Sequence, residues 1–134
     1  MDVVITEWSL NSYLELKHTQ VFSDKEYKTV LRPDAELLKQ GWPPKDAKFS
    51  NPKFWGPATG LGGKTIQHGF KMKWHNIGNG KVQLRLAVVF WDGKVFLCQG
   101  YVKANENVDK REMAKLKNRI NDIANGTYSY RGSL

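Results

Sequence analysis

The chain has 134 residues, 40% of them hydrophobic and 12% aromatic, which excludes a disordered chain and predicts one domain spanning residues 1–134. Its formal net charge of +8 favours a polyanionic partner, nucleic acid above all. No run of about 18 apolar residues is present, and no secretory signal is apparent, so we expect a cytoplasmic protein without a membrane span.

The first 40 residues predict a strand followed by two helices. A β-branched run over residues 2–8 reads as a strand, and Ser9 is placed to cap a helix that continues to about residue 17. Ser23 and Glu26 have the spacing of a capping box, which predicts a second helix. Pro33 should kink or restart this helix near Arg32.

Residues 41–63 are expected to form a long loop, because they hold four of the five prolines together with several glycines. Four aromatic residues in this segment, Trp42, Phe49, Phe54 and Trp55, indicate that it packs onto the domain. The alternative is a loop that borders a substrate site.

Three strands are predicted over residues 64–75, 81–91 and 94–103. A turn over residues 76–80 joins the first two, and Asp92-Gly93 is a strong hairpin signal between the second and third. Neighbouring strands should therefore be antiparallel. The stretch from Lys64 to Lys103 carries seven Lys and Arg residues against one acid, Asp92.

Strand alternation assigns these residues to two faces. Apolar residues should form a core face, with Ile66, Phe70, Met72 and Trp74 on the first strand and Leu84, Leu86, Val88 and Phe90 on the second. The opposite face should be open to solvent and basic, with six candidate site residues: Lys71, Lys73, His75, Arg85, Tyr101 and Lys103.

The chemistry of these six side chains matches a phosphate site. Arg85 can contact a phosphate through two N–H groups, and Tyr101 can stack on a base. His75 is a candidate acid or base because histidine is the side chain whose reference pKa lies near neutrality. The alternative is a solvated face that simply carries lysines. His68 has the parity of the core face unless Gly69 forms a bulge. No metal-ligand spacing and no phosphate-binding glycine loop occur, so we expect neither metal nor cofactor.

The last helix is the clearest one. Asp109 is expected at its N-cap with Glu112 three residues later, and Asn125-Gly126 should end it. One apolar stripe runs along it through Met113, Leu116, Ile120 and Ile123. Residues 127–134 form a tail. The single cysteine, Cys98, reads as a buried strand residue.

Residues 70 to about 123 resemble the RelE/ParE superfamily of toxins from type II toxin–antitoxin systems. The resemblance is carried by Phe70-Lys-Met-Lys73, the strand pair from Leu84 to Leu97 with its Asp-Gly turn, Gly100-Tyr-Val-Lys103 and the helix opening at Asp109. It implies an α+β fold: a strand and two helices, then an antiparallel sheet of about four strands with a C-terminal helix.

The resemblance to the RelE-like branch implies a metal-independent endoribonuclease, an mRNA interferase that inhibits translation. The 2′-hydroxyl attacks the neighbouring phosphate in such enzymes. Lys71 and Lys73 then match the paired lysines, Arg85 the phosphate clamp, and Lys103 with Tyr101 the end of the last strand. His75 is added from its position as acid or base.

The partners implied are mRNA, on or off the ribosome, and an antitoxin that is acidic where it contacts the basic face. Two other functions stay open: a ParE-like gyrase inhibitor with the same fold, and a nucleic-acid-binding module without catalysis. Several members end in a catalytic tyrosine, so Tyr128 and Tyr130 are further candidates.

Overall fold

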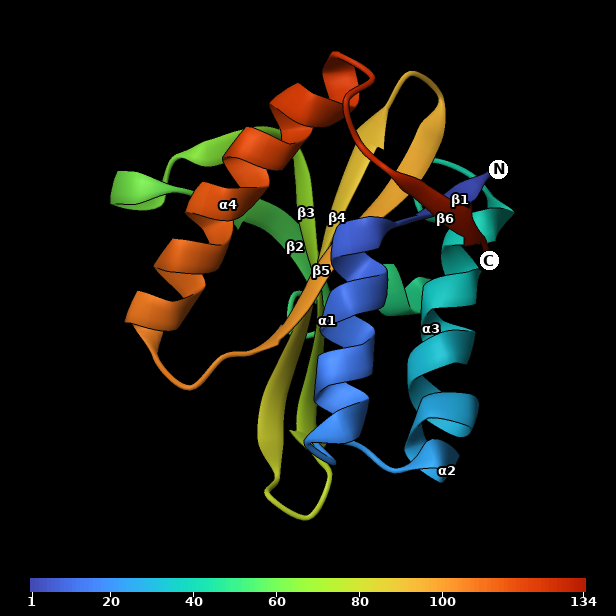
Figure 1. The fold of residues 1–134 in the computed structure, drawn as a ribbon, viewed down its shortest axis with the longest axis vertical. Coiled ribbons are helices and arrows are strands. Elements are labelled where there is room, and N and C mark those ends of the chain that lie inside the picture. Colours follow the sequence, from blue (N-terminus) through green and yellow to red (C-terminus); the bar gives the residue numbers. More distant parts are fainter.

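A six-stranded mixed sheet forms the centre of the computed structural model, which describes residues 1–134 (Figure 1). The strand order is β2-β3-β4-β5-β1-β6, and only the β1–β5 pair is parallel. The strands are β1 Val3–Thr6, β2 Trp55–Thr59, β3 Thr65–Ile77, β4 Val82–Trp91, β5 Lys94–Val102 and β6 Tyr130–Ser133. The predicted α+β class is thus confirmed, with six strands in place of about four.

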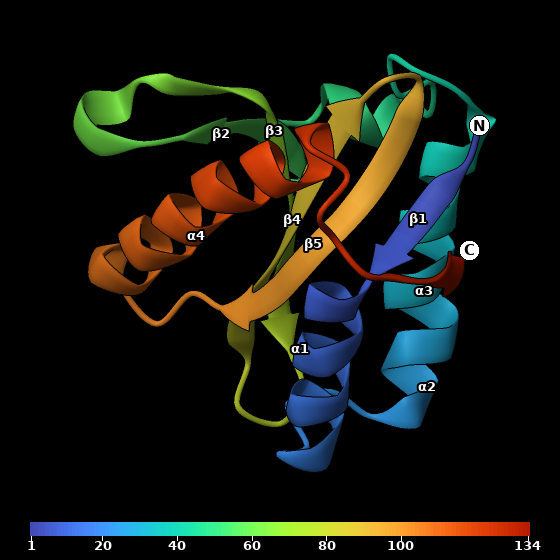
Figure 2. The ribbon, with the colours of Figure 1, turned by 45° about the horizontal axis from the view of Figure 1, so that its top comes forward.

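Helices cover both faces of this sheet (Figures 1 and 2). One face holds α1 Glu7–His18 and a continuous helical segment made of α2 Asp24–Glu26, a π-helical turn Tyr27–Leu31, α3 Arg32–Glu36 and a 3₁₀ turn Leu37–Gln40. The other face holds α4 Glu106–Ala124. No helix is long and apolar enough to cross a bilayer.

Each face has its own apolar core. The first is formed by twelve buried residues that include Val3, Leu31, Leu38, Met72, Trp74, Leu84 and Val88. The second joins the sheet to α4 and includes Ala58, Ile66, Ala87, Val89, Cys98, Met113, Leu116 and Ile120. The expectation of a solvent-exposed basic face is therefore wrong, because the apolar stripe of α4 needs a surface to bury and takes this one.

A bulge in β3 changes which residues share a face. His68 has a left-handed φ of 72°, and the pairing with β2 shifts register between Pro57 and Thr59. Ile66 consequently belongs to the α4 core, whereas Phe70 packs against the other one. The prediction that these two residues share a face is wrong, since one bulged residue inverts the parity on one side of it.

Two helix starts differ from the prediction. Thr6 rather than Ser9 caps α1, and its hydroxyl accepts from the Ser9 N–H at 3.3 Å. Asn105 rather than Asp109 caps α4, accepting from Val108 N–H at 3.0 Å. Asp109 is consequently one turn inside the helix, where it faces the sheet.

Other local predictions are confirmed. Ser23 and Glu26 form the capping box, and Asp92-Gly93 turns β4 into β5. The helix changes from π to α geometry at Arg32, near the predicted position, and the Arg32 N–H donates to the Tyr27 carbonyl in the π-helical turn that precedes Pro33.

The segment 41–63 is more regular than expected. It contains β2 and two short 3₁₀ turns, Ala47–Ser50 and Leu61–Gly63. Its aromatic rings pack onto the sheet as predicted: Trp42 stacks on Phe90 at 4.5 Å and Trp55 on Phe70 at 5.4 Å between ring centroids. The tail 127–134 likewise contains a strand, β6, which pairs with β1.

Candidate functional site

The predicted basic residues gather on the α4 side of the sheet, beside the N-terminal turns of that helix. Lys73 lies opposite Arg85, and Arg85 lies opposite Tyr101, across β3, β4 and β5. Lys71 and Lys103 stand near the same point, since both act on charges in this group. We call Lys71, Lys73, Arg85, Tyr101 and Lys103, with Asp109, the basic cluster.

Asp109 is the centre of this cluster. Its Oδ2 accepts from Lys71 Nζ at 3.1 Å and its Oδ1 from the Tyr101 hydroxyl at 2.5 Å. All three residues are buried. Burial opposes ionisation of Asp109, but the bonds from Tyr101 and Lys71 outweigh it and lower the pKa of the carboxyl. Burial and the bond to Asp109 strongly raise the pKa of Tyr101.

Lys73 and Arg85 have no carboxylate partner. Lys73 Nζ donates to the Pro52 carbonyl at 2.9 Å, and Arg85 Nη1 donates to the carbonyls of Trp74 and Leu84 at 3.4 and 3.3 Å. Burial, followed by the charges of Lys71, Arg85 and Lys103, lowers the pKa of Lys73. Neither side chain is neutralised by a carboxylate; Lys73 is half-buried, whereas Arg85 is only 7% exposed.

Lys103 and His75 lie at the margin of the cluster. Lys103 Nζ pairs with Glu106 Oε1 at 2.9 Å, and the Glu106 side chain is 74% exposed. His75 is exposed, and its Nε2 donates to the Lys53 carbonyl at 2.6 Å. This carbonyl is next to that of Pro52, which holds Lys73, so one short segment positions both side chains.

Two expected roles do not match this geometry. Tyr101 is 6% exposed, so its ring has no open face on which a base could stack. Lys71 is 8% exposed and its ammonium is paired with Asp109, so it is a structural partner rather than an open phosphate ligand. Of the further candidates, Tyr128 packs on Phe96 and Tyr130 lies exposed on β6, so neither belongs to the basic cluster.

The role of Asp109 was missed by the sequence analysis, although the sequence carries a signal for it. Extending the apolar stripe of α4 back by one turn from Met113 reaches Asp109. A carboxylate on a buried stripe needs a cation or donors facing it. The α4 stripe thus predicts a basic partner on the sheet, which Lys71 supplies.

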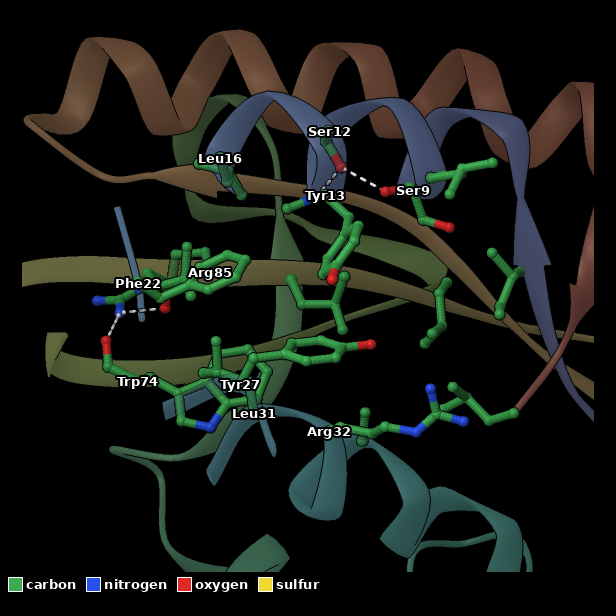
Figure 3. Close-up of a pocket in the computed structure, with 18 residues that line it drawn as sticks. Ser9, Ser12, Tyr13, Leu16, Phe22, Tyr27, Leu31, Arg32, Trp74 and Arg85 are labelled. Atoms are coloured by element: carbon green, nitrogen blue, oxygen red, sulfur yellow. Dashed lines mark hydrogen bonds between the residues drawn. The ribbon is translucent and has the colours of Figure 1, made fainter. Parts of the chain in front are cut away.

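An apolar cavity of about 390 Å³ lies on the opposite face, between α1, the α2–α3 segment and the sheet, and Arg85 of the basic cluster is among the residues that line it (Figure 3). Figure 3 shows Arg85 and Arg32 at opposite ends of it. Its serine hydroxyls are engaged: Ser9 donates to the Thr6 carbonyl, and Ser12 accepts from the Gly100 N–H. This cavity offers apolar walls but no catalytic set.

The basic cluster places four cations around one carboxylate, Asp109, and the exposed Glu106 pairs with Lys103 at its margin. Such an excess of like charge at a half-buried point is unfavourable for folding alone and suits the binding of a phosphate. Comparison of the chain with protein-family models, curated proteins and solved structures finds no match.

Proposed function

We propose that this chain is the toxin of a toxin–antitoxin pair and cleaves mRNA as a metal-independent endoribonuclease of the RelE-like kind. The observation that carries the proposal is the pair Lys73 and Arg85, side by side on β3 and β4 without a carboxylate partner. Of this pair, the Arg85 guanidinium stays protonated and stabilises the negative charge that develops on a phosphate during its displacement, and Lys73 lies beside it to accept a proton.

The order of elements supports the same proposal. A strand and helices on one face precede the antiparallel strands β3, β4 and β5, and a helix follows them, as expected for a RelE/ParE-like chain. The strands β2 and β6 then extend this arrangement at the two edges of the sheet.

The proposed reaction is an in-line transfer on RNA. The 2′-oxygen attacks the adjacent phosphorus, its proton passes to a base, and the bond from phosphorus to the 5′-oxygen breaks as an acid protonates that oxygen. Lys73 serves as the base, because its lowered pKa increases the neutral amine fraction at working pH. Arg85 binds the pentavalent phosphate, and His75 supplies the proton to the leaving oxygen.

The test of this function is induced expression in bacteria, with growth and transcript 5′ ends followed together. We expect wild type to arrest growth and create new transcript ends. We expect Arg85→Ala to lower cleavage about 100-fold or more, because the phosphate loses its guanidinium clamp. Lys94→Ala removes an exposed cation at the start of β5 and should behave as wild type.

Each other outcome assigns a different function. Growth arrest with intact transcripts would point to a gyrase inhibitor of the ParE kind. RNA binding without arrest or cleavage would leave a binding module. Full activity in a folded Arg85→Ala protein would contradict the proposed site; circular dichroism of the purified variant verifies the fold.

A second prediction concerns the base. Initial cleavage rates of purified wild type should rise with pH up to the lowered pKa of Lys73, since the neutral amine is the active form. Lys73→Arg keeps the charge but stays protonated, so both the rate and this rising limb should be lost. A pH profile unchanged in Lys73→Arg would assign the base elsewhere.

A further inference from the structure

A second basic site lies outside the basic cluster, in a groove of about 860 Å³ lined by residues of the β2–β3 hairpin and α4. Figure 2 shows these two elements next to each other. Its walls carry the cations Lys64, Lys110 and Lys117 and the rings of His68 and Trp91. None of the fifteen residues that line it is acidic. The groove is thus a positively charged channel with aromatic groups along it.

The three lysines stand on both walls. Lys110 and Lys117 are two turns apart on one side of α4, which separates them by about 10 Å. Lys64 faces them from the end of the hairpin, just before β3. All three are exposed, and none forms an ion pair within the chain. Their charges are therefore available to a ligand.

The aromatic pair gives the groove a stacking surface. The His68 ring meets Trp91 edge to face, with centroids 4.9 Å apart and an interplanar angle of 83°. Both rings are half-buried, so they line the groove while the domain holds them in place. Cations interspersed with fixed aromatic rings are the combination that binds single-stranded nucleic acid, because phosphates pair with the cations and bases stack.

We infer that this groove binds a single-stranded RNA segment that flanks the cleaved phosphate. The inference rests on the proposed function and deepens it, since it gives the substrate a path. Lys110 directly follows Asp109, so the groove ends at the helix turn that closes the basic cluster. A strand lying in the groove leads to Lys73 and Arg85.

The test is fluorescence-anisotropy titration of the full chain with a labelled 2′-O-methyl RNA of about 12 nucleotides. The blocked 2′-hydroxyl prevents cleavage, so binding is measured independently of catalysis. The variant is Lys64→Ala/Lys110→Ala/Lys117→Ala. Its matched control is Lys25→Ala/Lys28→Ala/Lys39→Ala, three exposed and unpaired lysines of the helical segment on the opposite face.

The groove variant should bind at least about tenfold more weakly at low salt, and the slope of log affinity against log salt should fall by about 2 units. The control variant should match wild type in both the affinity at low salt and the salt slope. Equal behaviour of the two triple variants would overturn the inference while leaving the cleavage proposal intact. If only the groove variant loses binding and wild type cleaves no RNA, the groove remains an RNA-binding site and the nuclease proposal is wrong.

An acidic protein segment is the competing occupant. Poly-glutamate of matched length serves as its probe in the same titration. If it binds wild type through these lysines and the RNA does not, the groove is a protein-binding site and the RNA inference is wrong.

Discussion

Asp109→Ala is expected to lower the free energy of unfolding by about 3–5 kcal/mol, because it leaves the Lys71 ammonium buried without a partner. The substitution also removes the acceptor of the Tyr101 hydroxyl. The side chains of Lys71 and Asp109 are only 10% and 9% exposed, so water cannot replace the lost contacts cheaply. Urea denaturation of both proteins measures the difference.

The matched control is Glu106→Ala, which removes the exposed carboxylate that pairs with Lys103. Glu106 is exposed, so its pair with Lys103 should contribute at most about 1 kcal/mol. A second variant, Lys71→Met/Asp109→Leu, replaces both buried charges with apolar groups and should recover most of the stability lost in Asp109→Ala. Equal losses for Asp109→Ala and Glu106→Ala would show that the buried pair has no special role.

The difference in free energy of unfolding between wild type and Asp109→Ala should also depend on pH. The folded-state pKa of Asp109 lies below its unfolded value, so its ionised form stabilises the fold at pH values above the unfolded pKa of about 3.9. This contribution is lost as the pH falls through the folded pKa. The pH-dependent part of the difference between wild type and Asp109→Ala should therefore shrink below about pH 4.

Gly78→Ala should destabilise the fold by about 4 kcal/mol, through strain and a collision together. Gly78 has a φ of 71°, and a Cβ there would lie 2.1 Å from the Val21 carbonyl oxygen. Its N–H also donates to Glu26 Oε2 at 2.9 Å, which fixes the β3–β4 turn against the capping box of α2. Neither segment can move away without breaking this bond.

Gly93→Ala isolates the contribution of strain. Gly93 has a φ of 74°, and a Cβ there would meet nothing within 4 Å. Gly93→Ala should lower the free energy of unfolding by only about 1 kcal/mol, which is the strain of an alanine in the left-handed region. Thermal or urea unfolding of both variants compares them. Similar losses at the two positions would mean that the β3–β4 turn yields to the added methyl group.

The two stability predictions concern opposite sides of the sheet, and one of them connects stability to the proposed site. Asp109 fastens α4 to β3 and β5 through Lys71 and Tyr101, and it also lies among the cations that lower the pKa of Lys73. The N-terminal turns of α4 thus serve both as cover for the second core and as one wall of the basic cluster.

The sequence alone determined those structural features that depend on residues close together in the chain. Ser23 and Glu26 are three residues apart, and Asp92-Gly93 suits the left-handed turn it makes, so the α2 cap and the β4–β5 hairpin follow from neighbouring residues. The apolar stripe of α4 and the alternation along β4 follow from helix and strand periodicity in the same way.

Only the tertiary structure determined which elements cover the strands β3, β4 and β5, which carry the basic residues. The strand β6 forms because it pairs with β1 at the other end of the chain, and no local pattern indicates so distant a partner. The strand β2 pairs with the neighbouring β3, but the prolines and glycines of residues 41–63 hide it in the sequence. The bulge at His68 inverted the parity before Gly69. Above all, the apolar stripe of α4 packs on the sheet face that was expected to be open to solvent. That face is therefore a second core, and Asp109 of α4 lies there bonded to Lys71.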